Sequence, residues 1–189
     1  MAQTKNVWFT QKASDPKRQF RFEVNVGGEN VPLWYIKTAS KPKANVSVVE
    51  HQFLDYTFKY PGRVTWDNIS LTLVDPVDPD LAGEFLSILL GSGYEYPETS
   101  NARQTMSKQK AMAALQGCSI VSTDADGRTI EKWTLQNPFL VSIDFGGTLD
   151  YSSDDMQEIS VEIAYDYAKC ETAKGNSTTL TDVVAKRRI

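Results

Sequence analysis

The chain has 189 residues, of which 41% are hydrophobic and 23% are charged, as expected for one soluble globular unit and not for a disordered chain. Its net charge of -4 and pI near 5.1 disfavour a broad basic face for nucleic acid. The longest apolar run, "FLSILL", is too short to cross a bilayer, and the first residues lack the apolar core of a signal peptide. We therefore expect no membrane insertion and a reducing cytoplasm, in which Cys118 and Cys170 are free thiols.

The N-terminal part predicts an arm, strands and a long hairpin. Residues 1–18 are polar and form the expected N-terminal arm. "FRFEVNV" alternates, so one face of a strand carries Phe20, Phe22, Val24 and Val26. After the turn "GGEN", "VPLWYIKTAS" is expected to return as a second strand.

The segment 46–60, "VSVVEHQFLDYTFKY", is rich in β-branched and aromatic residues. It predicts an extended hairpin arm closed by Pro61-Gly62. In the following stretch, "PGRVTWDNISLTLVD", Ile69, Leu71 and Leu73 alternate with polar residues and predict a core strand.

Two helices are expected next. Asp78 followed by Pro79 fits an N-cap and a first helical residue, and apolar residues then recur at helical spacing up to Gly91. "RQTMSKQKAMAALQG" favours a second helix that ends at Gly117.

The C-terminal half predicts further strands. Residues 118–139 form a hairpin around "DADG", because Gly127 accepts the positive φ of such a turn. One face of the next strand is expected to carry Phe139, Val141, Ile143 and Phe145. The last strand alternates the inward residues Ile159, Val161, Ile163, Tyr165 and Tyr167 with an acidic outer face. The pattern predicts a mainly β fold, a sandwich or barrel of about seven strands with a flanking α-helix.

No set of residues converges on catalysis. His51 is the sole histidine, and no serine or cysteine motif accompanies it. "DADG" fails as a calcium loop, because Thr129 stands where glycine is needed and Leu135 where the bidentate glutamate is needed. We expect no enzyme, no cofactor and no metal.

The aromatic residues leave one alternative open. Six of them could form a stacking platform for a ligand, although burial in the core is the more ordinary role of such residues in alternating strands: Trp34, Tyr35, Trp66, Trp133, Tyr165 and Tyr167. A ligand-binding β-sandwich module therefore stands beside an assembly protein that contacts other chains through strand edges and arms.

The order of the strands resembles that of the tail tube proteins of contractile-tailed bacteriophages. The resemblance covers residues 19–168 and rests on "FRFEVNVGG", "VSVVEHQFLDYTFKYPG", "VTWDNISLTLVD", "GEFLSILLG", "DGRTIEKWTLQNPF" and "LDYSSDDMQEISVEIAYDYA". Residues 1–18 and 169–189 extend beyond it as an N-terminal arm and a C-terminal extension.

The resemblance implies hexameric rings stacked into a hollow tube in the virion tail, assembled in the bacterial host cytoplasm. It implies a surrounding sheath protein and a baseplate initiator as partners. The lumen would pass DNA and a length-measuring protein without binding them specifically. A baseplate-proximal tube initiator, the inner tube of a phage-derived contractile injection system and the ring protein of type VI secretion remain alternatives.

Two sets of residues are candidates for these roles. An acidic set would line the channel and repel DNA phosphates, or would instead face solvent or a neighbour: Glu23, Glu158, Glu162 and Asp166. An arm set would reach a neighbouring subunit or the next ring: His51, Phe53, Tyr56, Phe58 and Lys59.

Overall fold

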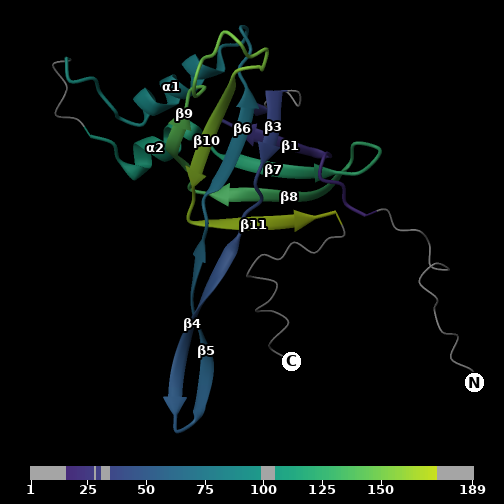
Figure 1. Ribbon diagram of the computed structural model, residues 1–189, viewed down its shortest axis with the longest axis vertical. Helices are drawn as coiled ribbons and strands as arrows, with labels where there is room; N and C mark the ends of the chain where they lie inside the picture. The colour runs from purple at the N-terminus through teal and green to yellow at the C-terminus, as the bar shows by residue number, and fades with distance from the viewer. Residues whose placement is uncertain (1–15, 28, 31–34, 99–104, 174–189) are drawn as a thin grey trace, which may run out of the picture.

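The computed structural model describes residues 16–27, 29–30, 35–98 and 105–173, which form β-strands and two α-helices (Figure 1). The strands in the first half are β1 Phe22–Val26, β2 Glu29–Asn30, β3 Ile36–Ala39, β4 Ala44–Phe53, β5 Tyr56–Trp66 and β6 Ile69–Val74. The helices are α1 Leu81–Gly91 and α2 Lys108–Leu115. The remaining strands are β7 Cys118–Thr123, β8 Thr129–Gln136, β9 Phe139–Asp144, β10 Glu158–Ala164 and β11 Tyr167–Thr172. The predicted mainly β class with flanking helices is confirmed.

The strands build three antiparallel sheets. A five-stranded sheet has the order β11-β8-β7-β1-β2, a four-stranded sheet has the order β3-β6-β10-β9, and β4 pairs only with β5. The two larger sheets pack with their strands crossing, and the β4–β5 hairpin extends away from them (Figure 1). The described residues thus contain eleven strands, more than the seven or so expected. Part of the difference arises where one predicted strand is both β10 and β11, which lie in different sheets, and where the predicted turn "GGEN" contains β2.

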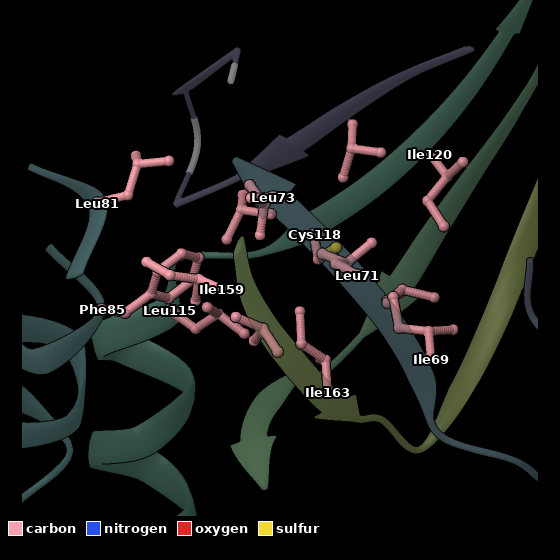
Figure 2. Packing of buried hydrophobic residues seen from close by; sticks show 14 of the residues in the cluster. Ile69, Leu71, Leu73, Leu81, Phe85, Leu115, Cys118, Ile120, Ile159 and Ile163 are labelled. Atoms are coloured by element: carbon pink, nitrogen blue, oxygen red, sulfur yellow. The ribbon is translucent and has the colours of Figure 1, made fainter. Parts of the chain in front are cut away.

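The core lies between the two larger sheets (Figure 2). In the four-stranded sheet, β10 pairs with β6 so that Ile163 faces Ile69, Val161 faces Leu71 and Ile159 faces Leu73. All six side chains are at most 1% exposed. They pack against buried residues of the five-stranded sheet, namely Val24, Val26, Cys118, Ile120 and Leu135. The inward alternation predicted for both segments is confirmed.

The helices close one end of this core. The N-cap of α1 is Asp80 rather than Asp78, because the Asp80 carboxylate accepts a hydrogen bond from the Gly83 N–H at 3.0 Å. α2 begins after Ser107, whose hydroxyl accepts from the Lys110 N–H at 3.3 Å, so it is shorter than expected. Gln116 takes a left-handed conformation at φ 54° and ends α2 just before Gly117.

The face predicted for β9 is correct at Ile143 but wrong at the other predicted positions. Opposite β10, Ser142 pairs with Glu162 but Leu140 pairs with Ile163, so Val141 is an extra residue in a β-bulge. Before the bulge, at Phe139 and Leu140, the predicted alternation is inverted, and after it the alternation within β9 is as predicted. Leu140 and Ile143 therefore pack against the core, while Val141 is 51% exposed.

Three other segments also differ from the prediction. The first strand begins at Phe22, and Phe20 is 74% exposed. Pro61 and Gly62 lie inside β5 rather than in a closing turn, since the hairpin turns at Leu54 and Asp55. Within the described part of the return strand expected at 31–40, the structure has β3, in the other sheet from β1, and residues 31–34 lie outside the described residues.

The last predicted strand is two strands. β10 ends at Ala164, the chain passes to the five-stranded sheet, and β11 pairs with β8 up to Thr172. Tyr165 is buried, but Tyr167 belongs to β11 and is exposed. Neither helix in the described part of the chain is long and apolar enough to cross a membrane.

Candidate assembly surfaces

The β4–β5 hairpin is a two-stranded ribbon with apolar side chains in solvent. Nine large apolar residues along it are between 49% and 84% exposed: Val46, Val48, Val49, Phe53, Leu54, Tyr56, Phe58, Tyr60 and Val64. A lone two-stranded hairpin is marginally stable in water, and a long apolar surface is typical of an interaction site. The hairpin therefore has the properties of an element that is completed by a partner.

The register of the hairpin separates an apolar face from a polar one. Phe53 pairs with Tyr56, His51 with Phe58, and Val49 with Tyr60, and directly paired residues project to the same face. We call this set of six residues the apolar hairpin face. The opposite face carries Glu50, Gln52, Thr57 and Lys59.

Four of the five predicted arm residues thus share one face. Lys59 does not, since it lies on the polar face and pairs with Glu50 at 3.6 Å. His51, the sole histidine of the sequence, lies among aromatic residues on this exposed ribbon.

A bulge bends the base of the hairpin. The register shifts between Val46 and Val48, and the Ser47 hydroxyl accepts a hydrogen bond from the Arg63 N–H at 2.8 Å. A side chain at Gly62 would collide with the Ser47 hydroxyl, so glycine is needed for this close approach. The bend fixes the direction in which the apolar hairpin face leaves the body.

The predicted acidic set does not lie on one surface. Glu158 and Glu162 project from the outer face of β10, opposite the buried Ile159 and Val161. Glu23 lies in β1 of the other sheet, and Asp166 follows β10 at the passage between the sheets. The structure brings together only Glu158 and Glu162.

The partners of these carboxylates differ. Glu158 forms an ion pair with Lys37, and Glu162 accepts from the Asn68 amide at 2.9 Å. Asp166 is bound by the Lys108 ammonium at 2.6 Å and the Asn137 amide at 2.7 Å, which lower its carboxyl pKa. Asp166 is thus engaged in tying α2 and the end of β8 to the body.

Sequence reasoning missed the rest of the outer face of the four-stranded sheet. Glu162 of β10 is flanked by Ser142 of β9 and Ser70 of β6. Ser160 of β10 is flanked by Asp144 of β9 and Thr72 of β6. We call this surface the polar sheet face. The predicted alternation already places Ser142 and Asp144 opposite the inward Ile143, but only strand pairing shows that they lie beside Glu162 and Ser160 of β10. In this sheet, β3 and β9 are edge strands.

The tryptophans in the described part of the chain do not form an open platform. Trp66 packs on the core with its ring centroid 6.0 Å from that of Tyr165. Trp133 also packs on the core, and its indole N–H donates to Glu131. Trp34 lies outside the described residues. No group of three or more metal-ligating side chains occurs within residues 16–27, 29–30, 35–98 and 105–173.

Glu131 is a buried carboxylate that joins three segments. Its side chain is 10% exposed and binds Lys17, Lys41 (3.0 Å) and the Trp133 indole. Burial alone would raise its pKa, but the hydrogen bonds from Lys17, Lys41 and Trp133 outweigh it and lower the pKa to about 2. Glu131 therefore anchors the segment before β1 and the segment after β3 onto β8.

This anchor predicts an acid-sensitive contribution to stability. Because the folded pKa lies below the ordinary value of 4.5, the contribution is complete above pH 4.5 and is lost as the pH falls toward 2. We expect Glu131→Gln to lose about 1–3 kcal/mol of unfolding free energy at neutral pH, and this deficit to shrink between pH 4.5 and 2. Urea unfolding of both proteins across this range measures it. A deficit that does not change with pH would contradict the assignment.

Several solved structures share this fold. No protein-family model and no curated protein matches the chain. A chain of the anti-feeding prophage baseplate, solved by cryo-EM with sixfold symmetrisation, superposes with a TM-score of 0.63, covering 86% of this chain and 99% of that chain at 16% identity. A chain of the sheath/tube terminator of the extracellular contractile injection system PVC gives 0.63, with 85% and 100% covered at 20% identity.

A third match comes from the PVC sheath–tube complex in the extended state. Its TM-score is 0.59, with 84% of this chain and 93% of that chain covered at 19% identity. At such low identity the likeness concerns the fold, and function has to be argued from the surfaces. The chain therefore has the tail-tube-type fold found in contractile injection systems.

Proposed function

We propose that this chain is a structural subunit that assembles into stacked hexameric rings and forms the inner tube of a contractile, tail-like particle. The observation that carries the proposal is the apolar hairpin face, which projects from the body and has no partner in the described part of the chain. The tube-type fold supports the same function, because the matched chains come from baseplate, sheath–tube and terminator structures.

Burying the apolar hairpin face would drive association. Each large apolar side chain that becomes fully buried contributes roughly 1.5–3 kcal/mol. Several such residues in one contact exceed the ordering and desolvation costs of forming an interface. We therefore assign the hairpin to the contact between copies, within a ring or between stacked rings.

Ring closure would also cover the edges of the four-stranded sheet. Exposed edge strands promote uncontrolled pairing, and a closed array of sheets removes them. In a head-to-tail ring, β9 of one copy lies beside β3 of the next, and the two strands are antiparallel in that arrangement. Six sheets would then form one continuous inner wall.

The polar sheet face is the surface we assign to the channel. It carries Asp144, Glu158 and Glu162 among serine and threonine hydroxyls. Carboxylates repel nucleic-acid phosphates, so DNA and a length-measuring protein would pass without adhering. Glu23 and Asp166, which lie elsewhere, are left out of this lining.

The proposed partners are a sheath on the outside and a baseplate initiator at one end. The matched chains come from baseplate, sheath–tube and terminator structures, so the same fold suits a main tube subunit and an initiator. We assign the chain no enzymatic activity, in keeping with structural matches drawn from tube-bearing assemblies.

Electron microscopy combined with light scattering tests this function. The concentrated full chain is expected to form rings or hollow tubes with sixfold end views and a mass that grows in whole-ring steps. A monomer at every concentration, with tryptophan fluorescence that changes when a sugar is added, would instead support a ligand-binding module.

A further inference from the structure

A basic cleft opens between the two sheets. It has a volume of about 740 Å³ and is bounded by the segment before β1, the edge strand β3 and part of β7. Its charged lining residues are all cationic: Lys17, Arg18, Arg21, Lys37 and Lys41. Apolar residues form much of the remaining lining, among them Phe20, Phe22, Ile36 and Ile120. We call this site the basic cleft.

The cleft keeps a positive excess after its own ion pairs are formed. Lys17 and Lys41 share the single carboxylate of Glu131, and Lys37 pairs with Glu158. Within the described residues, Arg18 and Arg21 have no carboxylate at ion-pair distance. The Arg21 guanidinium lies over the exposed Phe20 ring, 5.4 Å from its centroid. The cleft therefore suits a segment that is both acidic and apolar.

The loop between β9 and β10 has this chemistry. Residues 144–158 contain five carboxylates and no lysine or arginine. Leu149, Tyr151 and Met156 are strongly exposed beside Asp150, Asp154 and Asp155. We call residues 147–157 the acidic loop.

Internal hydrogen bonds hold the acidic loop in shape. The Asp150 carboxylate accepts from the Ser152 N–H at 2.9 Å, which lowers the pKa of Asp150 and keeps it ionised. The Gln157 amide donates to the Phe145 carbonyl at 2.9 Å, and Gly147 N–H donates to Asp144 at 3.1 Å. A preformed loop loses little conformational entropy when it binds.

The acidic loop does not fill the cleft of its own chain. Lys37 lies between them, since it lines the basic cleft on one side and the hollow under the acidic loop on the other. The bonds of Glu158 and Gln157 hold the loop on its own side of Lys37. As far as the described residues go, the cleft of each chain is thus open to another chain.

The register within the four-stranded sheet places the acidic loop and the basic cleft so that they would meet across a contact between copies. Across the sheet, Asp144 at the end of β9 pairs with Ser160 of β10, and Ser160 pairs with Thr72 of β6. Thr72 in turn pairs with Thr38 of β3, so all four residues lie at the same level. If β9 of one copy lies beside β3 of the next without a change of level, the loop after Asp144 would reach Ile36 and Lys37, which line the cleft.

We propose that the acidic loop of each subunit docks in the basic cleft of its neighbour and is the electrostatic contact that closes the ring. This inference rests on the proposed ring assembly. The hairpin is a poorer occupant, because it carries both signs of charge in Glu50, Asp55, Lys59 and Arg63. Opposite charges on separate surfaces make a head-to-tail contact, the type that generates rings.

Charge reversal on each side tests the docking. The loop variant is Asp154→Lys/Asp155→Lys, and the cleft variant is Arg18→Glu/Arg21→Glu. Each change places like charges in contact, which costs several kcal/mol, so we expect each variant alone to associate at least about tenfold more weakly. A matched control, Glu84→Lys/Glu98→Lys, alters two exposed acids outside the acidic loop and should associate like the unmodified chain.

Mixing the two variants gives the decisive sample. A reversed loop fits a reversed cleft, and the unchanged loop of the cleft variant fits the unchanged cleft of the loop variant, so an equimolar mixture should regain association. Sedimentation velocity at low and high salt measures it, with circular dichroism confirming the fold of each variant. Rings that form equally well from every variant would overturn the docking and leave the tube function standing. Absence of association in every sample, the unmodified chain included, would overturn both.

Discussion

Phe53→Asp/Phe58→Asp is expected to abolish rings and tubes while leaving a folded monomer. Both side chains lie on the apolar hairpin face, which makes no contact with the core cluster. Replacing two phenylalanines in a buried contact removes roughly 3–6 kcal/mol of favourable free energy from apolar burial. The two new carboxylates add the cost of desolvating two charges. Association should therefore fall more than about a hundredfold. Light scattering and electron microscopy measure this loss.

The control for this variant uses the opposite face of the same ribbon. Gln52→Asp/Thr57→Asp adds the same two charges at a neighbouring pair on the polar face. It should assemble far better than Phe53→Asp/Phe58→Asp. Normal tubes from the Phe53→Asp/Phe58→Asp protein would show that the apolar hairpin face is not an interface.

Leu73→Ala is expected to lower the free energy of unfolding by about 2–5 kcal/mol. Leu73 is 1% exposed and packs between the two sheets, so the shorter side chain leaves a cavity that the crossing strands cannot close (Figure 2). The matched change Leu149→Ala removes the same atoms from an exposed loop and should alter stability by less than about 0.5 kcal/mol. Urea denaturation midpoints of the three proteins measure both effects. Equal stability of the two variants would contradict the assigned core.

The parts of the fold predicted from the sequence are those governed by local alternation. β6 and β10 have an uninterrupted period of two, and their inward residues are among the most buried in the described part of the chain. The hairpin arm was also predictable, because β-branched and aromatic residues continue through Phe53 and Phe58 without a helical period. These signals require no knowledge of the partner strand.

The remaining features depend on pairing, which a single sequence does not reveal. The bulge at Val141 is defined by the pairing of β9 with Glu162 and Ile163 of β10. It reverses the faces on which the preceding residues of β9 lie. Likewise, alternation gives Glu23 and Glu158 equivalent positions, and only the topology assigns them to different sheets. The basic cleft escapes sequence reasoning for the same reason, since it joins residues near 17–22 with residues near 36–41 and Ile120.

A cryo-EM map of the particles formed by the concentrated full chain is the most direct test of the account. We expect a hollow tube of stacked sixfold rings in which the apolar hairpin face is buried between copies and Glu158 and Glu162 face the channel. A particle in which the hairpin stays in solvent, or a chain that remains monomeric at every concentration and salt condition, would contradict the account.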